Sequence, residues 1–250
     1  MSEPLVVRDD AGGICTLTLN RPDKRNAINR DLFRAFRAHI RDLESDHDTG
    51  LVVITGAGGH FCAGHDLKQA PHADALGWLR QEMLILERLT KLRQPVIAKV
   101  AGSCYTGGLE LALAADFIVC GDSARFADTH GKWGLVPGWG LSQRLPRRIG
   151  QARALEMMFT SRPYSGREAA AMGLANHCVV DADLDAKVTE LAALILSNSR
   201  HSNAENKRLV YDTDGMALDT GLSHELMRNA GFDPAMRQKG EAIGNARKGG

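Results

Sequence analysis

Several features that would assign a protein to a special class are missing from this sequence. Its 250 residues include 31 Lys and Arg against 30 Asp and Glu, so the formal net charge is only +1. A chain this close to neutral has no overall field that attracts nucleic acid or an anionic membrane. We therefore expect no nucleic acid and no membrane among its partners, and any anionic ligand must be held by a local group of cations.

Signals for export and for covalent cross-linking are also missing. The first residues, MSEPLVVRDD, lack the basic start and the apolar stretch of a secretory signal. No apolar run approaches the roughly 18 residues of a membrane span. The five cysteines contain no C-x-x-C pair, which argues against a disulfide framework or a zinc knuckle. We expect a cytoplasmic protein whose cysteines serve as small buried hydrophobic side chains.

What the sequence does contain is an alternation of strand and helix patterns. With 44% hydrophobic residues, a chain of this length can bury a substantial core. Period-two patterns or short β-branched runs predict strands within residues 13–22, 51–55, 95–100 and 117–127. Helical spacing predicts helices within residues 29–50, where Asn29 is a suitable N-cap, and within residues 76–89. This order predicts an α/β fold.

The last third of the chain has a different character. Two short helices are predicted within residues 151–174, and the segment from about Leu184 to the end is mostly helical in pattern. No internal repeat and no low-complexity linker separates this tail from the rest. We therefore expect it to pack on the core or on a neighbouring subunit.

Two of the predicted strands run into glycine-bearing loops, GAGGHFCAG at 56–64 and AGSCYTGG at 101–108. Glycine lets a ligand oxygen approach the main chain, and two such loops can direct free N–H groups at one point, as in an oxyanion hole. A helix that begins near Gly107 would add positive potential there. Glu110 would lie one turn into this helix, and an acid in apolar surroundings is suited to moving a proton beside a carbonyl carbon.

Simpler interpretations of these loops remain open. A glycine pair before a helix is often only a tight turn, and Glu110 is then a capping acid. A phosphate-binding loop fits less well, because neither stretch has the spacing G-x-x-x-x-G-K-[ST]. Cys62, His65 and His72 do not repeat a metal-ligand spacing, so we expect no metal site.

Three segments occur in order: GAGGHFCAGHDLK, PVIAKVAGSCYTGGLELALAADF and ARFADTHGKWGLVPGWGLSQRLPRRIG. Together they resemble the enoyl-CoA hydratase/isomerase (crotonase) superfamily, and the likeness runs from LNRPDKRNA to about residue 180. The resemblance implies a crotonase-like spiral of β-β-α turns, with an α/β core over residues 1–190 that holds an acyl-CoA site. It also implies a helical region over residues 191–250 that makes homotrimers, often paired as hexamers.

The same resemblance assigns candidate residues. The backbone N–H groups of His65 and Gly107 fall on the family's two oxyanion donors. The substrate is expected to be an acyl-CoA thioester, with coenzyme A as part of the substrate and no separate cofactor. Residues expected to contact it are Lys24, Arg25, Ala27, Ala63, His65, Asp66, Leu67, Lys68, Gly107 and Gly108. The cations Lys24, Arg25 and Lys68 are candidates for the CoA phosphates, although each also fits an ordinary solvated surface.

Glu110 falls on the first of the two catalytic glutamates of the family's hydratases. The second glutamate is missing, because His130 stands at its position. Asp128 would project to the opposite face if this segment is extended. His130 could hold a water or pass a proton, or it could be a hydrogen-bonded wall residue. The dehalogenase branch of the family is disfavoured, because no acid stands near Gly138.

Several functions fit these residues. We expect hydration of a 2-enoyl-CoA, in which Glu110 places the water. An isomerase or another enolate-forming enzyme, a protein that binds acyl-CoA without turnover, and a structural trimer are the alternatives. Trp133 and Trp139, on either side of Pro137 and Gly138, are expected to form walls of the acyl pocket.

Overall fold

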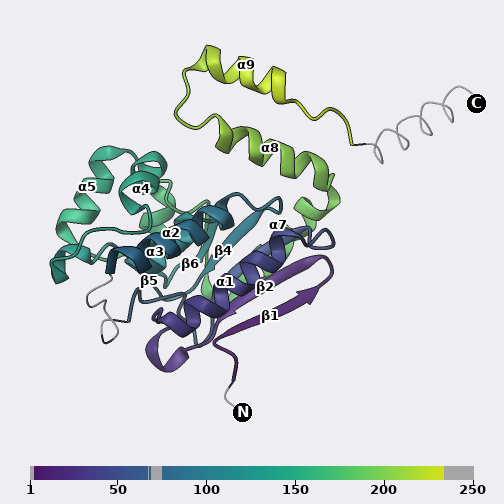
Figure 1. Cartoon of the computed structure of the whole chain (residues 1–250). Coiled ribbons are helices and arrows are strands. Elements are labelled where there is room, and N and C mark those ends of the chain that lie inside the picture. The colour runs from purple at the N-terminus through teal and green to yellow at the C-terminus, as the bar shows by residue number, and fades with distance from the viewer. Residues whose placement is uncertain (1–2, 67, 69–74, 234–250) are drawn as a thin grey trace, which may run out of the picture.

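The computed structural model describes residues 3–66, 68 and 75–233, and contains two β-sheets with helices packed on them (Figure 1). The larger sheet has six strands in the order β1-β2-β3-β4-β6-β9, and the smaller has the order β5-β7-β8. Every neighbouring pair in the larger sheet is parallel except β1 and β2. The predicted α/β class is confirmed. The strands of the larger sheet are β1 (Val6–Ala11), β2 (Ile14–Leu19), β3 (Leu51–Gly56), β4 (Val96–Val100), β6 (Phe117–Gly121) and β9 (His177–Val179).

The smaller sheet consists of β5 (Ser103–Tyr105), β7 (Arg125–Ala127) and β8 (Tyr164–Ser165). The segment 117–127, expected to hold a strand or a strand pair, contains β6 and β7, which belong to different sheets. Strand β1 was not predicted from the sequence. It is an edge strand of sequence VVRDDA in which only Val6 is buried, so it lacks an apolar face that a sequence pattern would reveal.

The first helix shows how local sequence sets an element. α1 (Arg30–Glu44) begins after Asn29, whose side chain accepts a hydrogen bond of 2.9 Å from the N–H of Leu32. This confirms the predicted N-cap. Its apolar side chains recur at helical spacing and are buried: Leu32, Phe33, Phe36, Ile40 and Leu43. α2 (Ala75–Thr90) packs beside α1 and also occupies the range predicted for it.

The remaining helices fill the second half of the chain. They are α3 (Gly107–Leu113), α4 (Leu141–Ile149), α5 (Gln151–Thr160), α6 (Gly166–Ala171), α7 (Leu184–Ser197), α8 (Arg200–Asp212) and α9 (Leu218–Arg228), with short 3₁₀ turns η1 (Pro22–Lys24), η3 (His130–Trp133) and η4 (Asp181–Asp183). The predicted helical pattern after residue 184 is confirmed as far as Arg228. In the described residues, no helix is long and apolar enough to cross a membrane.

The C-terminal helices differ in how closely they join the core. α7 packs on the larger sheet through Leu184, Val188 and Ala192. α8 buries only Ala204 among its residues, and α9 buries none. Figure 1 shows α8 and α9 extending away from the sheets, with α9 the farther of the two. The use of residues 191–250 for oligomerisation stays a prediction.

Candidate active site

The two glycine loops lie against each other at the ends of β3 and β4. The N–H of Tyr105 donates a hydrogen bond of 2.9 Å to the carbonyl oxygen of Cys62, and Cys62 forms an isolated bridge with Cys104. A Cβ atom placed on Gly64 would lie 3.5 Å from the backbone nitrogen of Gly107. Within the described residues, the N–H groups of His65 and Gly107 have no hydrogen-bond acceptor. Two adjacent main-chain donors are therefore free to hold a ligand oxygen.

Backbone conformation explains the glycines of these loops. Gly64 has φ of +98°, which favours glycine. Gly108 is needed for another reason, because a Cβ atom there would lie 2.4 Å from the carbonyl oxygen of Cys62. Between the loops, Thr106 holds a positive φ of 52° although it is not glycine. Its hydroxyl hydrogen-bonds that of Thr129 at 2.5 Å, which fixes this strained residue directly before α3.

Glu110 lies in the first turn of α3 with a side chain that is only 1% exposed. Its Oε1 atom accepts hydrogen bonds from the backbone N–H groups of Trp139, at 2.8 Å, and Leu141, at 3.2 Å. Its Oε2 atom has no hydrogen-bond partner in the part of the chain that the structure describes. Burial raises the pKa of the Glu110 carboxyl, and His130 and the two backbone donors offset only part of this effect. The carboxyl is thus held at one oxygen and available at the other.

His130 faces this available oxygen. Its Nε2 atom lies 4.0 Å from Oε2 of Glu110, and its Nδ1 atom lies 2.6 Å from Oδ1 of Asp128. The same Asp128 oxygen accepts a hydrogen bond of 3.1 Å from the backbone N–H of His130. The expectation that Asp128 projects to the opposite face is wrong. Residues two apart in an extended strand share a face, and here β7 already ends at Ala127 and the chain turns into the 3₁₀ helix at His130. Asp128, His130 and Glu110 therefore form a continuous row of buried polar groups.

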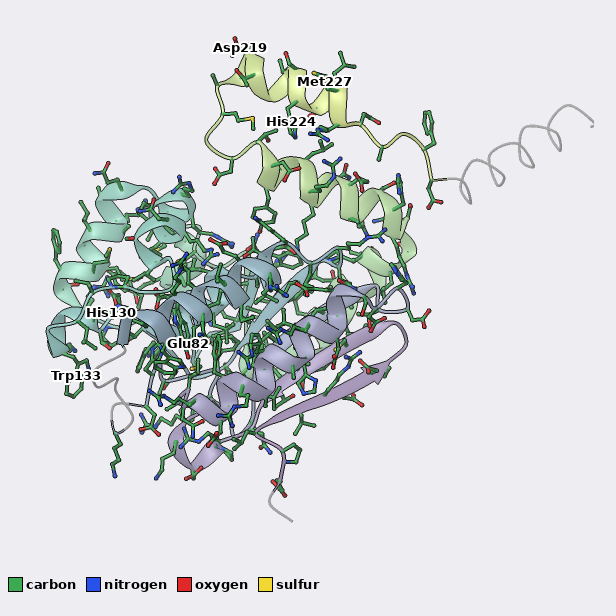
Figure 2. All side chains as sticks on the ribbon, viewed as in Figure 1. Glu82, His130, Trp133, Asp219, His224 and Met227 are labelled. Atoms are coloured by element: carbon green, nitrogen blue, oxygen red, sulfur yellow. The ribbon has the colours of Figure 1, made fainter. Side chains whose placement is uncertain are left out.

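A second buried acid, Glu82 on α2, was missed in the sequence (Figure 2). Its Oε2 atom accepts a hydrogen bond of 3.0 Å from the indole N–H of Trp139 and lies 3.3 Å from Nε2 of His65. Burial raises the pKa of the Glu82 carboxyl, and His65 and Trp139 offset part of this effect. The available signal was an acid between Leu79 and Met83, on the apolar face of a helix. It is the same kind of signal that identified Glu110.

The two predicted wall tryptophans have different environments. Trp139 is fully buried, with its ring 4.2 Å from that of His65 and 5.3 Å from that of Phe33. Trp133 is 59% exposed at the surface of the molecule (Figure 2). The turn of η3 carries the Trp133 side chain to the surface, and its role as a wall of the acyl pocket stays a prediction.

The loop with the predicted CoA cations lies beside the first glycine loop. The N–H of Ala63 donates to the carbonyl oxygen of Arg25 at 3.0 Å. Arg21, which was missed in the sequence, joins the two loops through hydrogen bonds to the Ala27 carbonyl, at 2.5 Å, and to Asp66, at 3.1 Å.

The predicted cations of this region remain accessible. The Lys24 side chain is 55% exposed, and Arg25 and Lys68 are exposed as well. Leu67 and His72 lie outside the described residues. No group of three or more His, Cys, Asp or Glu within the described residues is placed to hold a metal ion.

Comparison with known proteins shows the family of the chain. The sequence model of the enoyl-CoA hydratase/isomerase family matches residues 9–241. An Arabidopsis thaliana protein named "Probable enoyl-CoA hydratase 1, peroxisomal" is 35% identical over 222 residues, which are 88% of this chain and 83% of that one. A Mycobacterium tuberculosis enoyl-CoA hydratase is 34% identical over 223 residues, 86% of this chain and 83% of its own length.

Solved structures of the family have the same fold. The enoyl-CoA hydratase of Bacillus anthracis superposes with a TM-score of 0.83 at 33% identity, over 89% of this chain and 88% of that one. The enoyl-CoA hydratase of Thermoplasma volcanium superposes with a TM-score of 0.84 at 28% identity, over 90% of each chain. The family model, the relatives and the fold agree, and the chain belongs to the enoyl-CoA hydratase/isomerase family.

Proposed function

We propose that this protein adds water across the double bond of a 2-enoyl-CoA thioester. The observation that carries the proposal is the Oε2 atom of Glu110, which is buried, free of any partner within the described residues, and 4.0 Å from Nε2 of His130. The two free N–H groups of His65 and Gly107 lie in the adjoining loops. A base, an acid and an oxyanion site are the groups that such a hydration requires.

The proposed steps follow from these positions. The thioester oxygen accepts hydrogen bonds from the N–H groups of His65 and Gly107. Glu110 takes a proton from water, the water oxygen bonds to C3, and the electron pair of the double bond moves toward the thioester oxygen as an enolate. The imidazolium of His130 then gives a proton to C2. Transfer of the proton from Glu110 to His130 restores both groups, and Asp128 stabilises the cationic ring.

Binding of the CoA part is proposed to use the loops on the other side of His65. Lys24, Arg25 and Lys68 are exposed cations suited to the phosphate charges. Ala27, Ala63 and Asp66 bring the two loops together beside them. The reaction balances with water and thioester alone, so no cofactor besides the CoA of the substrate is proposed.

A trimer or hexamer is proposed as the assembly. Support comes from α9, which buries no residue in the isolated chain. Four large apolar side chains of this helix are between 57% and 84% exposed, and such a surface is normally covered by a partner. These side chains are Leu218, Leu222, Leu226 and Met227.

One alternative activity has specific support. Glu110 has a buried carboxyl oxygen without a hydrogen-bond partner among the described residues. A single base can move a proton between C2 and C4, as a double-bond isomerase does. Hydration is preferred because His130 supplies a second proton-transfer group opposite Glu110.

The test is loss of the enoyl-thioester absorbance across a series from crotonyl-CoA to long-chain 2-enoyl-CoA. Glu110→Gln should lower kcat by roughly 10²- to 10⁴-fold with little change in KM, because the side chain keeps its shape and loses its base. The control is Glu190→Gln. Glu190 is an exposed acid on α7, and its replacement should leave the rate unchanged. Full activity in Glu110→Gln would reject the mechanism. Binding without turnover by the wild type would select a non-catalytic acyl-CoA-binding protein instead.

A further inference from the structure

A cavity of about 320 Å³ lies between α1 and α2. One side carries three arginines of α1 at positions i, i+4 and i+7, which share a face of the helix. The other side carries Trp78, Gln81 and Glu82 of α2, and Phe33 of α1 also lines the cavity. The arginines are Arg30, Arg34 and Arg37.

The inner wall of this cavity is in contact with the proposed thioester site. The Trp78 ring lies 5.6 Å from that of His65, and the Phe33 ring lies 5.3 Å from that of Trp139. Glu82 contacts both His65 and Trp139 through its Oε2 atom. The N–H of His65 is a proposed oxyanion donor, and the N–H of Trp139 holds Glu110. The cavity therefore lies against His65 and Trp139, the two residues that carry the proposed oxyanion donor and hold Glu110.

The charges in the cavity are unbalanced. Arg34 is paired with Asp31 at 3.1 Å, whereas no carboxylate among the described residues lies within ion-pair distance of Arg30 or Arg37. The Cζ atom of Arg30 lies 5.4 Å from the centre of the Trp78 ring. The one acid in the lining, Glu82, is buried, and its Oε2 atom contacts Trp139 and His65 and no arginine of the cavity. The lining thus has an excess of guanidinium groups beside an aromatic surface.

We propose that this cavity receives the far end of the acyl chain, and that the preferred substrates are short 2-enoyl-CoA thioesters with a terminal carboxylate. Arg30 and Arg37 bind this carboxylate with their planar N–H donors, and Phe33 and Trp78 contact the methylene groups before it. A long uncharged chain would cover the guanidinium groups without pairing them, which costs free energy. The inference names the substrate class and rests on the proposed function for the position of the thioester.

Binding can be tested apart from turnover by calorimetry with two saturated thioesters. Glutaryl-CoA carries the carboxylate, and 5-methylhexanoyl-CoA has two methyl groups in place of the carboxylate oxygens. We expect glutaryl-CoA to bind at least roughly tenfold more tightly. Arg37→Gln should remove most of this preference and leave the affinity for 5-methylhexanoyl-CoA unchanged. Equal affinities in the wild type would overturn the inference.

The control uses the same helix. Arg41 lies one turn beyond Arg37 on α1 and does not line the cavity. Arg41→Gln removes the same charge and should leave both affinities unchanged. If Arg41→Gln removes the preference as fully as Arg37→Gln does, the carboxylate is held by the general positive field of α1 and by no contact in the cavity. That result would overturn the inference.

Turnover separates this inference from the proposed function. The pair 2-pentenedioyl-CoA and 5-methyl-2-hexenoyl-CoA repeats the comparison with substrates that can be hydrated. Hydration of both with equal kcat/KM supports the proposed function and rejects the carboxylate preference. Tight binding of glutaryl-CoA without turnover of any enoyl-CoA supports the cavity assignment and rejects hydration.

Discussion

The carboxyl of Glu110 and the imidazole of His130 face each other across 4.0 Å in the interior of the protein. Each is held on its far side, Glu110 by the N–H groups of Trp139 and Leu141, and His130 by Asp128. Their unbonded atoms therefore point into one space. A histidine at this position can serve the chemistry of a second carboxyl group because its own acid partner orients it.

The first prediction concerns this row of three groups. His130→Ala should lower kcat by about 10²-fold, because it removes the proposed proton donor to C2. Asp128→Asn should lower kcat less, since the ring remains and loses only the partner of its Nδ1 atom. The measurement is steady-state hydration of the best enoyl-CoA by each variant.

A double variant tests whether Asp128 acts through His130. In that case Asp128→Asn added to His130→Ala should cause no further loss, because its effect depends on the imidazole. Losses that multiply would show that Asp128 contributes independently of the ring. A folded-state check by circular dichroism is needed because all three groups are buried.

The second prediction concerns pH and the buried acid Glu82. Its pKa is raised above the ordinary 4.5, so the folded protein keeps this proton to a higher pH than the unfolded chain does. Between those two pKa values the folded state binds more protons, and the free energy of unfolding falls as pH rises. The glutamine side chain of Glu82→Gln cannot ionise, so the variant does not lose unfolding free energy in this way. Its unfolding temperature relative to the wild type should therefore rise as the pH increases above about 4.5, the ordinary pKa of a glutamate.

The matched control is the exposed Glu190 of α7. Glu190→Gln should change little across the same pH range, because an exposed acid is solvated in both states. If the difference between Glu82→Gln and the wild type is independent of pH, burial does not raise the pKa of this carboxyl.

The parts of the fold that follow from local rules were predictable. α1 was found from Asn29 and the spacing of its apolar residues, because capping and amphipathic periodicity act within a few residues. Strand β1 was not, since its position depends on pairing with β2 and its residues are mostly exposed. Pairing between strands is a tertiary property, and an edge strand of charged residues has no sequence pattern that predicts it.

The site also has parts that could be predicted from local sequence and parts that could not. The glycine loops and Glu110 could be identified because glycine before a helix and a lone acid in an apolar run are visible in the sequence. The contact between Asp128 and His130 depends on where β7 stops and the 3₁₀ turn starts. The partners of Glu82 depend on how α2 packs against the loop of His65, and helix packing of this kind has no local signal.

The third prediction concerns the second glycine of the pair. A Cβ atom on Gly108 would lie 2.4 Å from the Cys62 carbonyl oxygen, which is backbone and is fixed by its hydrogen bond from Tyr105. Gly108→Ala should therefore lower the free energy of unfolding by about 1–3 kcal/mol, as overpacked interiors do. Urea denaturation measures this change.

A glycine in an open helix provides the comparison. Gly221 lies within α9, and a Cβ atom there would meet only Thr213 at 3.8 Å. Gly221→Ala should stabilise the protein by about 0.5–1 kcal/mol through helix propensity. If Gly108→Ala is also stabilising, the two glycine loops are not packed as closely as the structure indicates.

The last prediction concerns how α8 is attached to the core. The Nζ atom of Lys207 lies 2.9 Å from Oδ2 of Asp116 and donates to the Gln94 carbonyl oxygen at 2.9 Å. The Lys207 side chain is only 8% exposed, so the ion pair is largely removed from water. Lys207→Met would leave the Asp116 carboxylate without its cation and should cost about 3–5 kcal/mol of unfolding free energy.

Arg208, the next residue, is the matched control because its ion pairs with Glu205 and Asp212 are more exposed and lie within the same helix. Arg208→Ala should cost less than about 1 kcal/mol, since water and salt screen such pairs. Adding Asp116→Asn to Lys207→Met should recover part of the loss, because no charge is then buried alone. Guanidinium chloride denaturation of the four proteins measures these differences. An equal cost for Lys207→Met and Arg208→Ala would show that the buried pair does not hold α8 to the core.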